Sequence, residues 1–347
     1  MKYGGLGVIN VTEIADSEFT YSCMLTEELT KSIISQGESD QDPEKEKEAK
    51  SKVSKLKREG NKTKLDELRQ AMTIKQKRLN ELNQQTCASA WLSALPIADQ
   101  NMVLTKREFW DALKIRYGWP VPRLASICAC GKPNDEIHAL TCMNGGFVTL
   151  RHNEVRNLTK ELLSEVCKDV EMEPALEPMT GEQFFGSTND SLNARLDVAA
   201  RGLWNSYQKA FVDIRVFNPM AKRYDNMTTT QALRVNEQEK KNKYMQRVLE
   251  TENGTFIPAV FSASGGMARE CTSLYNRISL LISEKRNTEY STTVKWVRTR
   301  LSFSLVKSLG YCLRGSRKWT KKYDITSVGD TDIESAVRQA RQDNVQN

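Results

Sequence analysis

The chain has 347 residues, of which 39% are hydrophobic and 27% are charged, with a formal net charge of +7. This length allows one large domain with appended modules, or two domains. No apolar run approaches the roughly 18 residues needed to span a bilayer, and the N-terminus lacks a basic-then-apolar signal pattern, so we expect a soluble intracellular protein. The eight cysteines are then expected to be reduced or metal-bound rather than paired in disulfides.

The N-terminal part of the chain is expected to be helical and solvated. Residues 1–36 are too few to fold alone and look like the end of a unit that begins upstream. From Gly37 to about Gly60 the chain is dense in Glu, Lys, Asp and Ser, which is typical of a linker or a solvated helix. Apolar residues then recur at helical spacing, which predicts one helix that packs against a neighbour. They are Leu65, Leu68, Met72, Leu79 and Leu82.

A further helix is predicted from Thr105 onward. Thr105 and Glu108 have the spacing of a capping box, in which each residue satisfies a main-chain N–H at the helix start. Gly118 and Pro120 end the pattern. Residues 37–125 therefore form a charged linker followed by a helical region.

A small metal-binding module is predicted at residues 126–146. Cys128, Cys130, His138 and Cys142 follow the pattern Cys-X-Cys-X7-His-X3-Cys. Thiolates and imidazole are the ligands that Zn²⁺ prefers, so we interpret this segment as a zinc knuckle. The second of the chain's two histidines, His152, follows only ten residues after Cys142.

The rest of the chain predicts a mixed α/β sheet flanked by helices. The expected order is a helix at 151–168, strands at 170–173, 194–200 and 210–217, a polar helix at 231–250, a strand at 255–262 and a long helical stretch at 268–315. The last residues, 321–347, are polar and expected to be disordered.

Two aspartates lie inside apolar, strand-like runs. Asp197 and Asp213 are sixteen residues apart on strands joined by a hairpin-length turn, so they can lie side by side. Burying a carboxylate without a partner costs roughly several kcal/mol, so we expect a cation between the two aspartates. Hard oxygen ligands of this kind suit Mg²⁺. Lys240 and Lys243 lie one helical turn apart and could assist metal-dependent phosphodiester hydrolysis. The alternative is that Arg195, Arg201 or Arg215 holds the aspartates in structural ion pairs.

The succession of motifs resembles the C-terminal region of non-LTR retrotransposon proteins that carry a restriction-like endonuclease. The match covers about residues 120–315. Its motifs are Cys128-Ala-Cys130…His138…Cys142, Arg151-His152-Asn153, Arg195-Leu196-Asp197, Val212-Asp213-Ile214 and Lys240…Lys243-Tyr244. In that family a zinc knuckle precedes an Arg-His motif, two acidic catalytic positions and a Lys-X-X-Lys-Tyr-like helix.

This resemblance implies a restriction-endonuclease-like PD-(D/E)XK fold over residues 147–320. It implies that Asp197 and Asp213 bind Mg²⁺, that Lys240 or Lys243 assists the attacking water, and that DNA, with element RNA, is the partner. The glycine-rich start then looks like a remnant of a reverse transcriptase thumb in residues 1–36, with the polymerase module upstream, and the protein would act in the nucleus.

Two departures from the family pattern bear on the lysine and on the metal ligands. Arg215 stands where the simplest nuclease motif has lysine, and arginine cannot serve as a base, so the lysine role moves to Lys240 or Lys243. Leu196 replaces the proline that precedes the first acid. A third metal ligand could come from the preceding helix, where spacing cannot choose among Glu154, Glu161 and Glu165.

Several basic residues are expected to contact nucleic acid, with solvated helix surface as the alternative. They are Arg151, His152, Arg215, Arg314, Arg317 and Lys318. A structural role for His152 is equally open. We therefore expect an Mg²⁺-dependent DNA endonuclease, against two alternatives: a catalytically inactive zinc-dependent nucleic-acid-binding protein, and a helical partner protein built on residues 26–118.

Overall fold

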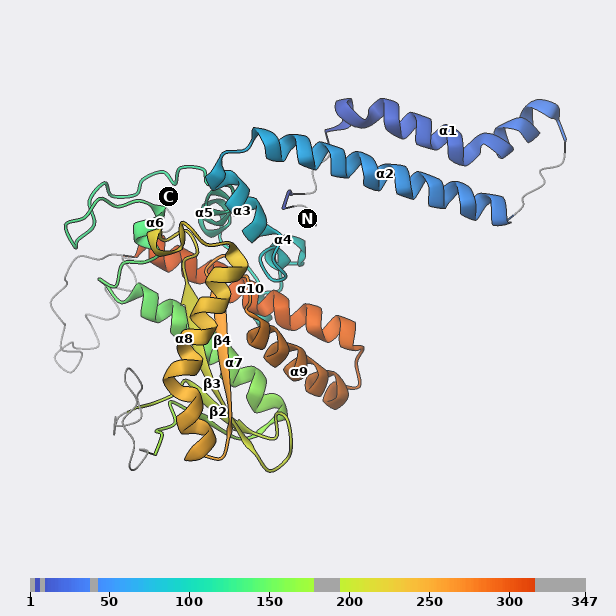
Figure 1. Cartoon of the computed structure of the whole chain (residues 1–347). Coiled ribbons are helices and arrows are strands. Elements are labelled where there is room, and N and C mark those ends of the chain that lie inside the picture. The colour runs from blue at the N-terminus through green and yellow to red at the C-terminus, as the bar shows by residue number, and fades with distance from the viewer. Residues whose placement is uncertain (1–3, 7–9, 38–42, 178–193, 316–347) are drawn as a thin grey trace, which may run out of the picture.

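Two long helices project from the rest of the molecule (Figure 1). The computed structural model describes residues 4–6, 10–37, 43–177 and 194–315. Helix α1, Val11–Ser35, lies beside α2, Pro43–Ala71, and the Lys57 ammonium lies 2.7 Å from a carboxylate oxygen of Glu18. From Pro43 onward the charged segment is helical, because Pro43 fits the first helical position and glutamates follow it in the first turn.

The predicted single helix over residues 65–82 is wrong, because the chain breaks at Thr73. Helix α3, Ile74–Asn83, begins with a capping box in which Thr73 accepts from the N–H of Gln76 and Gln76 accepts from that of Thr73. Leu79 and Leu82 are buried, whereas Leu68 on α2 is 59% exposed. The Thr-X-X-Gln signal for a new helix start is present in the sequence and outweighs the continuous apolar spacing.

The helix predicted at Thr105 is confirmed. Helix α5, Lys106–Tyr117, starts with the Thr105–Glu108 capping box and ends at Gly118, whose φ of 66° is the left-handed conformation that glycine tolerates best. Before it come the short helix α4, Ala90–Ser93, and the 3₁₀ turn η1, Ala98–Gln100. Side chains of α4 and α5 pack on the last helix of the chain, so the helical region joins the sheet domain.

The predicted mixed sheet is confirmed. Helix α7, Phe147–Val166, leads into β1, Lys168–Met172, β2, Val198–Arg201, and β3, Lys209–Phe217, which are antiparallel neighbours. The 3₁₀ turn η2, Lys222–Tyr224, and helix α8, Thr229–Glu250, then return the chain to β4, Thr255–Ser262, which pairs parallel to β3. A parallel partner requires such a crossover.

The second strand is shorter than predicted. It begins at Val198 rather than at Ala194, so Leu196 and Asp197 precede it. The segment before β2 is held to the chain after β1 by main-chain hydrogen bonds, among them one from the N–H of Glu173 to the carbonyl of Asp197 at 3.0 Å, and by a bridge between Ala175 and Arg195. Asp197 therefore lies where the ladder starts, at an end of the strand.

The long C-terminal helical stretch is two helices. Asn287 adopts a left-handed φ of 51° and separates α9, Arg269–Arg286, from α10, Tyr290–Arg314. Helix α8 lies over one face of the sheet, and α7, α9 and α10 cover the other (Figure 1). The larger core lies under the three-helix layer, and a smaller cluster that includes Tyr244 and Phe256 lies under α8.

None of the helices in these described ranges is long and apolar enough to cross a membrane. The expected disordered segment, 321–347, and the basic residues Arg317 and Lys318 lie outside the described residues.

Candidate functional site

The metal-binding module is built on a tight turn and a short helix. The main-chain N–H of Gly131 donates to the carbonyl of Cys128 at 2.8 Å, and Gly131 has a φ of 83°, so the turn brings Cys130 back beside Cys128. Helix α6, Glu136–Ala139, follows, and the Asp135 carboxylate caps it by accepting from the N–H of His138 at 2.7 Å. These local bonds hold Cys128, Cys130 and His138 near one another without the help of a metal ion.

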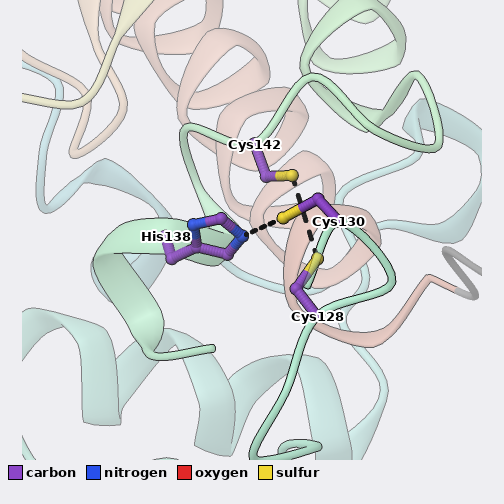
Figure 2. A group of neighbouring side chains, drawn as sticks. All are labelled: Cys128, Cys130, His138 and Cys142. Carbon is purple, nitrogen blue, oxygen red and sulfur yellow. Dashed lines mark hydrogen bonds between the residues drawn. The ribbon is translucent and has the colours of Figure 1, made fainter. Parts of the chain in front are cut away.

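The four predicted ligands are brought together (Figure 2). Their ligand atoms all lie within 4.8 Å of one another. Sγ of Cys128 lies 3.8 Å from Sγ of Cys142, and Sγ of Cys130 lies 3.3 Å from Nε2 of His138. A tetrahedral site with Zn–S bonds of about 2.3 Å has sulfur atoms roughly 3.8 Å apart, whereas a disulfide needs about 2 Å. This Cys₃His cluster could therefore bind a metal ion such as zinc.

The thiols of the cluster differ in environment. A hydrogen bond from the main chain of Lys132 lowers the pKa of Cys130, which favours the thiolate that binds metal. Burial raises the pKa of Cys142, so that thiolate needs a positive neighbour. A cation at the centre of the cluster would stabilise the thiolates of both Cys130 and Cys142.

Arg151 links this module to the sheet. It is 1% exposed, and its guanidinium donates to the carbonyl of Leu140 beside the cluster and to that of Val216 on β3, each at 3.2 Å. The structure thus buries Arg151 away from any nucleic acid, contrary to the predicted contact. The burial of Arg151 could have been predicted from the sequence, because Arg151 lies four residues before Val155 on the apolar side of α7.

The two aspartates lie on neighbouring segments of the sheet. The paired register of β2 and β3 ends at Val198 and Val212, one residue from each aspartate. Oδ2 of Asp197 accepts from the N–H of Ile214 at 2.5 Å and Asp197 also donates its own N–H to the carbonyl of Val212. Asp213 is 5% exposed, and Nζ of Lys240 lies 2.7 Å from its Oδ2. Two carboxylates and an ammonium group, from different elements, therefore lie together near the start of β2.

Burial dominates the protonation of Asp213. Loss of solvent raises its pKa above the usual value, and the charge of Asp197 acts in the same direction. Lys240 opposes this by stabilising the ionised form, yet the net direction is upward. A carboxylate in this position gains from any further positive charge.

His152 belongs to the same cluster. Its Nε2 lies 3.1 Å from Oδ2 of Asp197 and 3.1 Å from the carbonyl oxygen of Ile214, while Nδ1 lies 3.3 Å from Oδ1 of Asn153. Burial lowers the pKa of His152, but the hydrogen bond and charge of Asp197 outweigh it, so the pKa is raised overall. The imidazole is oriented toward the carboxylates rather than outward as a phosphate contact.

The structure distinguishes the two candidate lysines. Lys240 contacts Asp213, whereas Lys243 is exposed and its ammonium lies over the Tyr244 ring, 4.9 Å from the centroid. Glu237, one turn earlier on α8, accepts from the N–H of Glu270 at 2.9 Å and so caps α9. Lys240 is thus the lysine that α8 presents to the carboxylates.

The three arginines considered as structural partners of the aspartates have other partners. Arg195 donates to the carbonyl of Glu173, Arg201 pairs with Asp169 and Arg215 pairs with Glu239. Arg215, at 2.7 Å from Glu239, is therefore also neutralised and does not face outward as an unpaired phosphate contact. The charges that compensate Asp197 and Asp213 come from the flanking helices instead.

The expected third acid does not come from α7. Glu161 and Glu165 bind the guanidinium groups of Arg300 and Arg286, at 2.9 and 2.8 Å, and Glu154 is exposed. The α7 side chain that reaches Asp197 is His152. Helix position alone could not choose it, because the choice depends on which turn of α7 crosses the start of β2.

Arg314 has a structural role in the described chain. It makes a two-point contact with the carboxylate of Asp111 at 2.6 and 2.7 Å and donates to the carbonyl of Pro122 at 2.9 Å. Asp111 raises the pKa of Arg314 through this hydrogen bond. The contact fastens the end of α10 to α5 and leaves the predicted basic patch without its first member.

Within the described part of the chain, the Cys₃His cluster is the one group of three or more His, Cys, Asp or Glu residues whose ligand atoms all lie within 4.8 Å of one another. His152, Asp197 and Asp213 are more widely spread, with Asp213 drawn toward Lys240. No protein-family model matches this sequence, and no curated protein matches it. Inference about function therefore depends on the residues of the two clusters.

Proposed function

We propose that this protein is an Mg²⁺-dependent DNA endonuclease with a restriction-endonuclease-like fold, of the kind found in non-LTR retrotransposon proteins. The observation that carries the proposal is that Asp197, bound to the N–H of Ile214, lies beside the buried Asp213, with Nζ of Lys240 at 2.7 Å from Asp213. The order of helix α7, a strand preceded by Asp197 and a strand carrying Asp213 agrees with the PD-(D/E)XK layout.

The donor set fits a hard divalent cation. Burial raises the pKa of Asp213 and the charge of Asp197 acts in the same direction, so a cation bound by both would stabilise the ionised carboxylates. Asp197 and Asp213 would hold the ion. When bound, the ion would stabilise the negative charge on the phosphate and lower the pKa of the attacking water.

The chain's own residues supply the rest. When the ion binds Asp213, the Lys240 ammonium would move from Asp213 to the phosphate or the attacking water. Lys240 can do so because it lies on the rim of the cluster, with its side chain 20% exposed. Ile214 holds the Asp197 carboxylate by its N–H, which fixes one oxygen in place. Arg215 remains bound to Glu239 and supports α8 against β3.

The Cys₃His cluster would bind structural Zn²⁺ and help to grip nucleic acid. Its link to β3 through Arg151 sets a fixed distance between the knuckle and the carboxylates, which would align bound DNA with the cutting site. DNA, with element RNA, would then be the partner, a reverse transcriptase module would act together with this chain, and the nucleus would be the site of action.

The test is conversion of supercoiled plasmid to nicked circle by the full chain with Mg²⁺. Asp197→Asn, Asp213→Asn and Lys240→Ala should each lower nicking by about a hundredfold or more. Lys243→Ala is the matched control on the same helix and should keep most of the activity. Nicking that survives in both aspartate variants would refute the proposal, provided that the variants retain the wild-type thermal transition.

The second candidate is a non-catalytic nucleic-acid-binding protein. It is favoured by one observation, namely that His152 and Lys240 already compensate both carboxylates without a cation. This candidate predicts DNA binding without nicking in Mg²⁺ or Mn²⁺, and unchanged affinity when both aspartates are replaced by asparagine.

A further inference from the structure

The imidazole of His152 is aimed at the point where a cation would meet Asp197. Its Nε2 lies at the same distance, 3.1 Å, from the Asp197 carboxylate and from the carbonyl oxygen of Ile214. Both neighbours are acceptors, so without a cation Nε2 donates an N–H to them, and a cation bound by these oxygens would take the place of that proton. An octahedral cation with bonds of about 2.0–2.1 Å has adjacent ligand atoms roughly 3 Å apart, which is the spacing found here.

The next residue fixes the ring. Oδ1 of Asn153 lies 3.3 Å from Nδ1 of His152 and can only accept, so Nδ1 carries the proton in that contact. Metal-binding histidines are usually oriented in this way, with one ring nitrogen donating to an oxygen and the other left to the ion. With the proton kept on Nδ1 by this contact, release of the Nε2 proton to solvent leaves the Nε2 lone pair for the ion, so Asn153 prepares Nε2 as a ligand.

The preceding residue fixes the helix. Arg151 is buried and donates to the carbonyls of Leu140 and Val216, which holds this turn of α7 against β3. The three consecutive residues thus have three functions: Arg151 anchors the helix, His152 reaches the carboxylate and Asn153 orients the ring. This arrangement explains the Arg-His-Asn triplet without a phosphate contact.

We propose that Nε2 of His152 is a direct ligand of the cation held by Asp197 and Asp213. This inference rests on the proposed metal site. It gives the site a mixed nitrogen and oxygen donor set, which binds Mn²⁺ in preference to Mg²⁺, because imidazole suits transition metals while Mg²⁺ prefers oxygen. His152 occupies the place that the sequence assigned to a glutamate on α7.

The experiment uses the full chain with zinc supplied first and Mn²⁺ then added, read by pulsed electron paramagnetic resonance. The chain has two histidines, so ¹⁵N-histidine labels only His138 and His152. Bound Mn²⁺ should show nitrogen modulation that changes from ¹⁴N to ¹⁵N on labelling, and His152→Phe should abolish it. The double variant Asp197→Asn with Asp213→Asn should remove the bound Mn²⁺ and so assigns the signal to this site.

Two further variants test the ligand role of His152, one by changing the ligand atom and the other by removing the group that orients the ring. His152→Glu supplies an oxygen ligand and should lower the ratio of Mn²⁺ to Mg²⁺ affinity by about tenfold or more while keeping an aspartate-dependent site. Asn153→Ala should weaken Mn²⁺ binding by about tenfold, because it removes the group that orients the ligand.

The outcomes separate the two proposals. Mn²⁺ that depends on Asp197 and Asp213 but shows no histidine nitrogen would overturn the ligand role of His152 and leave the endonuclease proposal intact. Absence of any aspartate-dependent Mn²⁺, together with absence of nicking, would overturn both. Isotope-sensitive modulation lost in His152→Phe supports the ligand role, and the labelled wild type gives this readout even where the variant folds poorly.

Discussion

Nζ of Lys240 lies 2.7 Å from Oδ2 of Asp213, a residue that is only 5% exposed. The two residues come from different layers, since Asp213 is on β3 and Lys240 is on α8. Burial raises the pKa of Asp213, so the ammonium offsets part of a standing cost of folding. The pair is therefore important for stability as well as for the proposed chemistry.

Replacing Lys240 by methionine should destabilise the protein by about 3 kcal/mol, because it leaves a buried carboxylate without its partner. Urea unfolding followed by circular dichroism measures this. Lys243→Met on the exposed side of α8 is the control and should change stability by no more than about 0.5 kcal/mol. Adding Asp213→Asn to Lys240→Met should recover much of the loss, and equal effects of the two lysine variants would contradict the expectation.

His152 should make stability depend on pH. Its pKa in the folded chain is raised above the ordinary value of 6.5, so protonation favours the folded state. This contribution is complete below pH 6.5 and is lost as the pH rises through the folded pKa. The stability difference between wild type and His152→Phe should therefore be larger at about pH 6 than at about pH 9.

The control for this pH effect is the same comparison in an Asp197→Asn background. The asparagine removes the negative charge that raises the histidine pKa, so the difference between the two pH values should shrink. Urea midpoints across the pH range give all four curves. A difference that grows with pH would show that the sign is wrong.

The Cys₃His cluster should bind one Zn²⁺ per chain, as measured by plasma mass spectrometry on the purified protein. Cys142→Ser, which alters a buried ligand, should lose the zinc and lower the thermal transition, because metal binding contributes to folding. Cys23→Ser is the matched control, since Cys23 is an exposed cysteine on α1. Zinc content that is the same in the two variants would argue against the site.

Arg151→Met should cost about 3 kcal/mol, because it removes the donor for two buried carbonyls and so breaks the contact between the knuckle and β3. The surface variant Arg234→Met on α8 is the control, with an expected change of no more than about 0.5 kcal/mol. At a temperature where the variant is folded, the dependence of DNA affinity on salt should match wild type. A shallower dependence would restore Arg151 as a phosphate contact.

Local sequence signals determined the bounds of one helix and one of the two clusters. Thr105 and Glu108 predicted a helix start that the structure has, and Gly118 predicted its end. The spacing of Cys128, Cys130, His138 and Cys142 was enough to bring four ligands together, because a turn and one short helix span the whole set. Interactions between residues so close along the chain depend little on the rest of the fold.

Only the tertiary structure decided the neighbours of residues on different elements. The spacing on α8 allowed Lys240 or Lys243, and the packing of α8 on β3 selected Lys240. Arg151 and His152 adjoin in sequence, yet one is buried under carbonyls and the other reaches Asp197, 45 residues away. Helical periodicity gives the face of a side chain, but the register and crossing of packed elements set its partner.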